Sequence, residues 1–160
     1  MRIAGSLAAK TLDMLTTEIK QGITTDKIDK LGYEFIRDNG GYSAPLYYRG
    51  FKKSLCTSLN HVICHGIPST KRVLEEGDTL NVDVTAIIDE YYGDTSRMFC
   101  IGKTSVKVNN LIDATYESMM LAIRSLKPGL KLGDIGHSIQ SFIEKKAVSY
   151  THLRAHETRH

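Results

Sequence analysis

The chain has 160 residues, of which 41% are hydrophobic and 24% are charged, and its formal net charge is +3. This composition predicts one ordinary soluble domain with a substantial core. There is no apolar run of about 18 residues, so we expect no membrane span, and no signal-peptide pattern opens the sequence. The basic residues are scattered without interleaved aromatic residues, so we expect no nucleic-acid partner.

The N-terminal 40 residues predict two helices. Apolar residues recur at helical spacing over residues 3–19, and Gly22 ends this run. Thr24 or Thr25 can cap a second helix, which the glycine pair at 40–41 ends.

The middle of the chain predicts strands. Residues 55–58 and 61–65 have the pattern of short strands, and residues 66–69 and 75–78 that of turns. Two longer strands are expected after residue 78.

Helical spacing returns over residues 108–126, which Pro128 and Gly129 close, and over residues 132–142. The order of helix, helix, strands, helix, helix predicts an α+β fold. In such a fold the helices lie on one face of a mainly antiparallel sheet.

Two aspartates interrupt the apolar, β-branched runs of the predicted strands at 79–88 and 91–101. Asp83 lies in the first strand and Asp94 in the second. A carboxylate in a buried strand is costly unless a positive group meets it. The pair therefore indicates a site for two metal ions.

The expected turn between these strands fixes how the aspartates face each other. If Asp89-Glu90 is a two-residue hairpin loop, Asp83 faces Ser96 and Thr85 faces Asp94. The two aspartates are then diagonal neighbours on one face, with Cβ atoms up to about 7–8 Å apart. Side chains at that spacing can reach two metal ions about 3.5–4 Å apart. A β-bulge in the second strand would change this register.

Alternative interpretations need no metal. The two aspartates could be satisfied within the sheet by Arg97, Thr85 or Thr95. His65, which precedes Gly66, could be a hydrogen-bonded histidine beside a turn.

Cys56, Cys64 and Cys100 are odd in number and widely spaced. This pattern is typical of reduced thiols and predicts a cytoplasmic protein. We expect Cys64 and Cys100 to be small buried hydrophobic residues.

Four strings occur in the order Cys56-Thr57-Ser58-Leu59-Asn60, His65-Gly66-Ile67-Pro68, Asn81-Val82-Asp83-Val84 and Gly93-Asp94-Thr95-Ser96-Arg97-Met98-Phe99. Together they resemble the type I methionine aminopeptidases, which are metalloenzymes of the pita-bread fold. The resemblance runs from about residue 1 to residue 146. Relatives that cleave X-Pro bonds share the aspartate pair, whereas the Cys, Asn and His-Gly-Ile-Pro string indicates the methionine-specific branch.

The resemblance implies an enzyme that removes the initiator methionine from nascent polypeptides, which it would meet at the ribosome, and that is a monomer when complete. It implies two divalent ions (cobalt, manganese, iron, zinc or nickel) held by Asp83 and Asp94. His65 matches a histidine that hydrogen-bonds the scissile amide and helps to stabilise the tetrahedral intermediate. His65 is thus both a catalytic and a substrate-binding candidate.

Further positions match the family's substrate pocket and a cation site. Tyr48, Phe51 and Cys56 fall where the family lines its methionine pocket, and an apolar, polarizable slot suits a thioether. Asn60 and Val62 match positions whose carbonyl oxygens hold a monovalent cation in some members.

The family's remaining ligands do not occur in this chain. They are a histidine in a Gly-His-Gly-Ile-Gly string and two glutamates, one of which is the general base. His152 and His156 lack the glycine context and are not accepted as substitutes. Residues 1–146 therefore resemble the first half or so of a catalytic domain, truncated at both ends, and residues 147–160 resemble a non-native or disordered tail.

This departure has two expected consequences. The chain as written should be catalytically inert, because the base and three ligands are missing. It should also be poorly soluble, because a half-domain exposes apolar surface and strand edges. The rival hypothesis is a pita-bread-fold binding module that has kept the fold without the chemistry.

Overall fold

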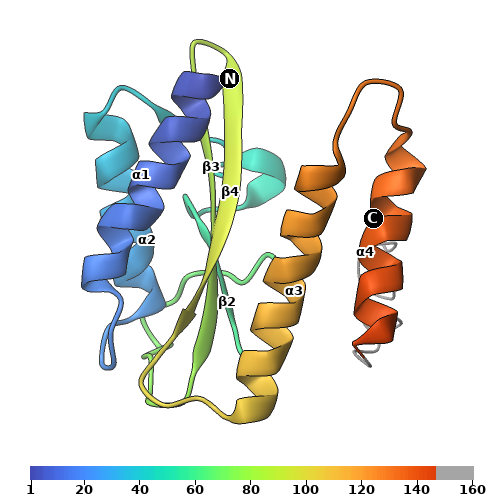
Figure 1. Cartoon of the computed structure of the whole chain (residues 1–160). Coiled ribbons are helices and arrows are strands. Elements are labelled where there is room, and N and C mark those ends of the chain that lie inside the picture. The colour runs from blue at the N-terminus through green and yellow to red at the C-terminus, as the bar shows by residue number, and fades with distance from the viewer. Residues whose placement is uncertain (147–160) are drawn as a thin grey trace. The chain divides into compact units, whose positions relative to one another are not determined.

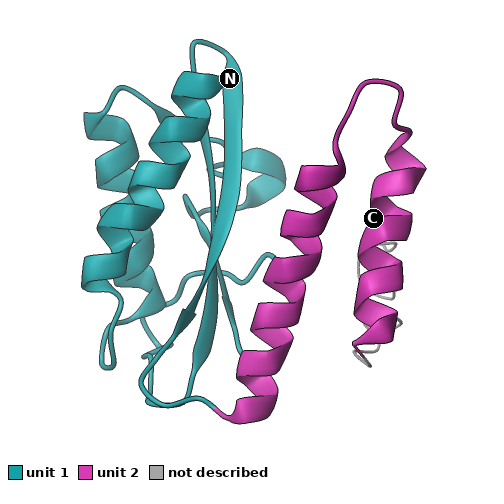
Figure 2. Cartoon of the chain, viewed as in Figure 1, with its two compact units in different colours: residues 1–104 teal, residues 105–160 magenta. Residues whose placement is uncertain are grey.

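The computed structural model describes residues 1–146, and the predicted tail lies outside the described residues. The chain divides into a first compact unit of residues 1–104 and a second unit that begins at Ser105 (Figure 2). The aspartates and the other candidate site residues all belong to the first unit.

Two helices open the chain where the sequence predicts them. Helix α1 spans Arg2–Glu18 and helix α2 spans Thr25–Asp38. Thr24 caps α2, and its side chain accepts a hydrogen bond from the backbone N–H of Lys27 at 3.2 Å. Both helices present an apolar stripe to the sheet, and Figure 1 shows them on one side of it.

The sheet has four strands, which are β1 (Tyr42–Ser43), β2 (Cys56–Leu59), β3 (Thr79–Ile88) and β4 (Tyr91–Cys100). All of the pairings are antiparallel and all involve β3. Strand β4 pairs along the whole length of β3, so β1 and β2 share the other edge of that strand. The short 3-10 helix η1 (Tyr48–Gly50) lies between β1 and β2.

The β3–β4 hairpin confirms the predicted register. Asp89 and Glu90 form its two-residue loop, and their φ angles of 49° and 66° are those of a type I′ turn. Asp83 pairs with Ser96 and Thr85 pairs with Asp94, and the register continues past Gly93 without a bulge.

Alternation along β3 separates the core from the candidate site. The even-numbered residues of β3 from 80 to 86 are fully buried beneath the helices, namely Leu80, Val82, Val84 and Ala86. They join the leucines and isoleucines of α1 and α2 in one hydrophobic core. The odd-numbered residues lie on the opposite face, and those from 81 to 87, Asp83 among them, are only partly buried.

The second unit contains helix α3 (Val106–Ser125) and helix α4 (Leu132–Lys145), both near their predicted positions. Ser105 caps α3 by accepting a hydrogen bond from the backbone N–H of Val108 at 3.3 Å. The two helices contact each other, and the buried residues of α3 are the small residues Ala114, Ser118 and Ala122. Within residues 1–146, no helix combines the length and apolarity needed to cross a membrane.

Residues 61–65 do not form the strand that the sequence predicts. Asn60 and His65 both have left-handed backbone conformations, with φ of 52° and 55°, and these interrupt an extended run. Gly66 instead folds back on β2, where its N–H donates to Ser58 Oγ at 3.1 Å and its carbonyl accepts from the Thr57 N–H at 2.8 Å. Residues 66–69 are consequently irregular rather than a turn.

The burial predicted for two cysteines is wrong. Cys64 and Cys100 are exposed, whereas Cys56 is buried. Cys100 pairs with Thr79 and so belongs to the face of the sheet that α1 and α2 do not cover. Cys64 lies in the irregular segment before His65, where no strand carries it into the core.

Candidate metal and substrate site

The two aspartates lie side by side on the face of the sheet opposite α1 and α2. Thr85, directly across the hairpin from Asp94, donates a hydrogen bond from Oγ1 to Asp94 Oδ1 at 3.1 Å. The pKa of Asp83 is raised to about 6, chiefly by burial and further by the charge of Asp94 and by hydrogen bonding to Asp94. Two carboxyl groups this close repel when both are ionised, so the pair favours a bound cation or a proton.

His65 belongs to the same group of side chains. Its charge lowers the pKa of Asp83, which places the imidazole within electrostatic range of the carboxyl pair. The neighbouring Gly66 fixes this position, because a Cβ atom there would lie 2.2 Å from the carbonyl oxygen of Thr57. His65 thus lies near enough to Asp83 for its charge to act on that carboxyl group, and its role at the site stays a prediction.

Cys56 completes this group from β2. It pairs with Asp83 across the β2–β3 ladder and is 8% exposed. Burial raises the pKa of its thiol to about 11, with further contributions from the charges of Asp83 and Cys64. The thiol is therefore protonated at neutral pH, which suits a neutral wall of a pocket and not a nucleophile.

Arg97 does not neutralise the aspartates. It pairs with Val82 and therefore projects from the helix-covered face, where Nη2 lies 2.8 Å from Asp13 Oδ1 on α1. Its Nη1 also donates to Thr16 Oγ1 at 3.0 Å. Of the partners in the metal-free interpretation, only the threonine at position 85 binds an aspartate of the pair in residues 1–146.

Tyr48 and Phe51 lie in the segment between β1 and β2. The N–H of Phe51 donates to the carbonyl of Tyr48 at 2.9 Å, and the N–H of Tyr47 donates to the carbonyl of Phe51 at 2.7 Å. Tyr48 is 64% exposed, with the guanidinium of Arg49 5.5 Å from its ring centroid. Their part in a methionine pocket remains a prediction.

Asn60 and Val62 lie in the turn after β2. Asn60 Nδ2 donates to Asp78 Oδ1 at 2.8 Å, and Asn60 Oδ1 accepts from the N–H of Thr79 at 2.9 Å. The N–H of Val62 donates to the carbonyl of Leu59 at 3.0 Å. The Asn60 side chain therefore has a structural role, and cation binding by the two backbone carbonyls remains a prediction.

The residues present fit part of a divalent-metal site. Asp83 and Asp94 offer adjacent carboxylates, and the hydroxyl of Thr85 orients one of them as an outer-sphere partner would. Among residues 1–146, no group of three or more histidine, cysteine, aspartate or glutamate side chains is arranged to hold a metal ion. Two carboxylates alone should therefore bind a divalent ion only weakly, because such ions take more ligands than two carboxylates supply.

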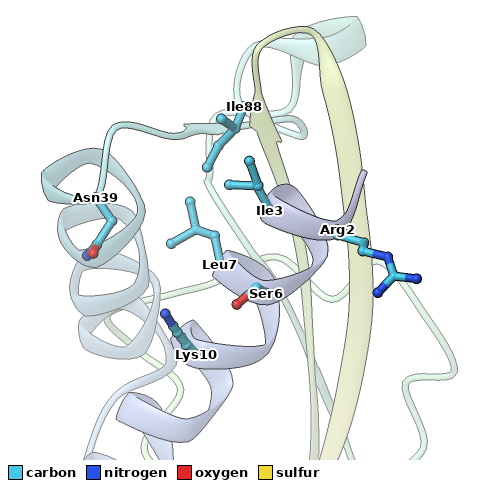
Figure 3. Close-up of a pocket in the computed structure, with 7 residues that line it drawn as sticks. All are labelled: Arg2, Ile3, Ser6, Leu7, Lys10, Asn39 and Ile88. Carbon is cyan, nitrogen blue, oxygen red and sulfur yellow. The ribbon is translucent and has the colours of Figure 1, made fainter.

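A cavity of about 320 Å³ lies away from this group, on the helix-covered side of the sheet (Figure 3). It is lined by Arg2, Ile3, Ser6, Leu7, Lys10, Asn39 and Ile88. Figure 3 shows the Arg2 side chain directed away from the apolar groups at its centre. The cavity shares no residue with the carboxyl pair, so it is not part of the candidate site.

Sequence reasoning missed the residues that support the candidate site. Asp29 on α2 accepts hydrogen bonds from the backbone of the segment that leads into β2. Its partners are backbone N–H groups, which every non-proline residue has, so no sequence signal distinguishes them. The cramped position of Gly66 was likewise outside the sequence prediction, although a glycine beside a candidate catalytic residue is a usable signal.

A model of the metallopeptidase family M24 matches residues 1–160. The chain is 52% identical to the methionine aminopeptidase of Rickettsia prowazekii over 145 residues, which are 91% of this chain and 56% of that protein. It is 50% identical to methionine aminopeptidase A of Synechocystis over 149 residues, 93% of this chain and 59% of that protein. The Escherichia coli methionine aminopeptidase is 43% identical over 150 residues, 93% of this chain and 57% of that protein.

Solved structures give the same fold. The methionine aminopeptidase of Rickettsia prowazekii matches with a TM-score of 0.87 and 51% identity, over 90% of this chain and 58% of that chain. The methionine aminopeptidase of Thermotoga maritima matches with a TM-score of 0.88 and 33% identity, over 91% of this chain and 58% of that chain. The Xaa-Pro dipeptidase of Bacillus anthracis matches with a TM-score of 0.78 and 20% identity, over 89% of this chain and 39% of that chain. At this identity the match shows a shared fold alone. The chain thus has a pita-bread fold and spans somewhat more than half the length of its curated relatives.

Proposed function

The chain belongs to metallopeptidase family M24, and from this premise we propose that it contributes the aspartate pair and substrate wall of an aminopeptidase that removes N-terminal methionine. The observation that supports this proposal is the position of Asp83 and Asp94 on the sheet face opposite α1 and α2, with His65 and Cys56 near them. The proposed substrates are nascent polypeptides in the cytoplasm, met at the ribosome, and the complete enzyme is proposed to be a monomer.

Each of these four residues has a proposed role. Asp83 and Asp94 would hold the divalent ions, which when bound would supply hydroxide at neutral pH and polarise the scissile carbonyl. His65 donates a hydrogen bond to the substrate at the scissile amide and to the oxyanion of the tetrahedral intermediate. Cys56 presents a neutral thiol to the methionine side chain, and contacts of this soft kind suit a thioether.

The pocket assignments extend the same proposal. Tyr48 and Phe51 would supply aromatic contacts to the methionine sulfur, each worth about 0.3–1.5 kcal/mol. The carbonyls of Asn60 and Val62 would hold a monovalent cation. The identity of the divalent ions (cobalt, manganese, iron, zinc or nickel) is to be decided by measurement.

Metal binding by the chain itself is the first test. We would titrate the 160-residue chain with Mn²⁺ and follow binding by electron paramagnetic resonance and calorimetry. Asp83→Asn and Asp94→Asn should each abolish specific binding, whereas Asp113→Asn, which removes an exposed carboxylate on α3, should not. If all four proteins bind equally, Asp83 and Asp94 are not the ligands.

Catalysis requires a protein that also has the remaining ligands. We would join residues 1–146 to the part of the Rickettsia prowazekii enzyme that this chain does not span, and measure release of methionine from Met-Ala-Ser. Metal-dependent release that Asp83→Asn abolishes supports the peptidase. Peptide binding without metal binding or turnover would favour the rival binding module.

A further inference from the structure

Three residues of α2, at every third position, contact residues 53–55, which lead into β2. They are Asp26, Asp29 and Gly32, and this spacing puts them on one face of the helix. Their partners are the consecutive residues Lys53, Ser54 and Leu55. We call these six residues the α2 clamp.

Asp29 provides the central contact of the α2 clamp. Its Oδ1 accepts the backbone N–H groups of Ser54 at 2.7 Å and Leu55 at 2.9 Å, while Lys53 Nζ lies 4.0 Å from Oδ2. The residue is 5% exposed, and burial raises the pKa of its carboxyl group against the lowering by these partners. A carboxylate this buried is tolerated because it accepts hydrogen bonds and lies near a positive charge. The same hydrogen bonds fix the backbone at Ser54 and Leu55, whose N–H groups donate them.

The other two α2 residues hold the ends of the segment. Lys53 forms an ion pair with Asp26, and hydrogen bonding to Lys53 lowers the pKa of Asp26. The Leu55 side chain is fully buried against Gly32, where a Cβ atom would lie 2.4 Å from Leu55 Cδ1. Residues 53–55 are therefore bound to α2 by an ion pair, by backbone hydrogen bonds and by side-chain packing.

This segment connects directly with the candidate site. Cys56 follows Leu55, opens β2 and pairs with Asp83. Tyr48 and Phe51 lie upstream, in the same connection between β1 and β2. A shift of the backbone at residues 54–55 would therefore move Cys56, the proposed pocket wall, whereas Asp83 is also held from its other side by the pairing of β3 with β4.

We propose that Asp29 is a positioning residue, which together with Gly32 and Lys53 sets the substrate-side wall at Cys56 and so determines the affinity for the methionine side chain. This inference rests on the proposed function. It predicts an effect on KM, because the α2 clamp acts on the pocket wall and not on the metal-binding aspartates.

The first experiment uses the 160-residue chain and needs no catalysis. With Cys64 and Cys100 replaced by serine, we would measure the alkylation rate of Cys56 by iodoacetamide and hydrogen exchange at Ser54 and Leu55. Asp29→Ala should raise both rates by about tenfold or more, because it opens this segment locally. Asp29→Asn should have a smaller effect, because its amide oxygen can still accept the two backbone hydrogen bonds.

Two controls separate positioning from general destabilisation. Asp38→Asn removes an exposed carboxylate from α2, and Gly5→Ala adds a methyl group where nothing lies within 4 Å. Neither should change these rates. Gly32→Ala should act like Asp29→Ala, while exchange at Val82 and Val84 in β3 should stay slow in every variant. Equal acceleration at β3 and at the α2 clamp would overturn the inference.

The second experiment measures kinetics in the joined enzyme described above. Asp29→Ala and Gly32→Ala should raise KM for Met-Ala-Ser by about tenfold and leave kcat within about twofold. A fall in kcat at unchanged KM would overturn the inference. If the joined enzyme is inactive without any substitution, the proposed function fails, and the exchange and alkylation rates still decide whether the α2 clamp positions Cys56.

Discussion

Thr85 donates a hydrogen bond to Asp94 across the β3–β4 hairpin, and this bond orients a carboxylate of the candidate metal site. The two-residue loop at 89–90 sets the register of the hairpin, and in that register Thr85 and Asp94 are directly opposite each other. The threonine hydroxyl uses one lone pair of the carboxylate and leaves the others for a cation. It therefore stands in the place of an outer-sphere partner, which orients a ligand without binding the metal itself.

Thr85→Val tests this role. Valine has a similar shape and β-branching but no hydroxyl, so the strand should be retained while Asp94 loses its orienting bond. We expect the affinity for Mn²⁺ to fall by about tenfold or more, measured by titration of the 160-residue chain. Thr85→Ser should retain most of the affinity. Equal affinities for all three proteins would show that the hydroxyl is unimportant for the metal.

The pKa of Asp83 predicts how metal-free stability depends on pH. Folding raises this pKa from 3.8 to about 6, so the folded chain binds the proton more tightly than the unfolded chain does. The free energy of unfolding should therefore fall as pH rises through this range. Asp83→Asn should match the unsubstituted chain near pH 4 and be more stable at pH 7, by at most about 3 kcal/mol.

Thermal unfolding at several pH values measures this difference. Mn²⁺ should narrow the difference at pH 7, because only the unsubstituted chain gains binding energy from the metal. A pH-independent difference between Asp83→Asn and the unsubstituted chain would contradict the assigned pKa.

Gly66→Ala should displace His65 and destabilise the first unit. The added Cβ would lie 2.2 Å from the Thr57 carbonyl oxygen, which is backbone and cannot rotate away. Overpacking of this kind costs about 1–3 kcal/mol or more. Gly133→Ala in α4 has nothing within 4 Å and is the matched control, expected to be neutral or stabilising by up to about 1 kcal/mol. Urea unfolding measures the free energy of unfolding of both variants. Equal free energies for Gly66→Ala and Gly133→Ala would mean that the backbone at Gly66 moves to accept the methyl group without cost.

The candidate metal site is incomplete in the described residues, so we expect the chain to be catalytically inert by itself. Residues 1–146 contain the two carboxylates but no group of three metal-ligating side chains, so hydroxide should not form at neutral pH. The 160-residue chain should release no methionine from Met-Ala-Ser above the blank. Metal-dependent release by the purified chain, lost in Asp94→Asn, would show that the described residues suffice.

The hairpin could be predicted from the sequence because its geometry leaves few choices. A two-residue loop at Asp89 and Glu90 permits one register, and strand alternation then places Asp83 and Asp94 on the same face. The four long helices followed from apolar periodicity in the same way, since a helix needs no information about distant residues.

Other features depend on contacts that the sequence does not reveal. The apolar run at 61–65 has the composition of a strand, but left-handed residues at 60 and 65 turn it into a loop beside β2. Asp29 resembles an ordinary solvated helix residue, and only the fold brings the N–H groups of Ser54 and Leu55 to it. Such backbone partners leave no pattern in the sequence.

The three cysteines should react at two distinct rates. Cys64 and Cys100 are exposed, whereas Cys56 is 8% exposed and has a thiol pKa of about 11. At pH 8 only about one thousandth of Cys56 is thiolate, compared with about a quarter for an ordinary cysteine. Ellman's reagent should therefore release two equivalents of thiolate rapidly and the third slowly, until urea unfolds the chain. Cys56→Ser should remove the slow phase alone. Three equal rates would place Cys56 at the surface and remove it from the wall of the candidate pocket.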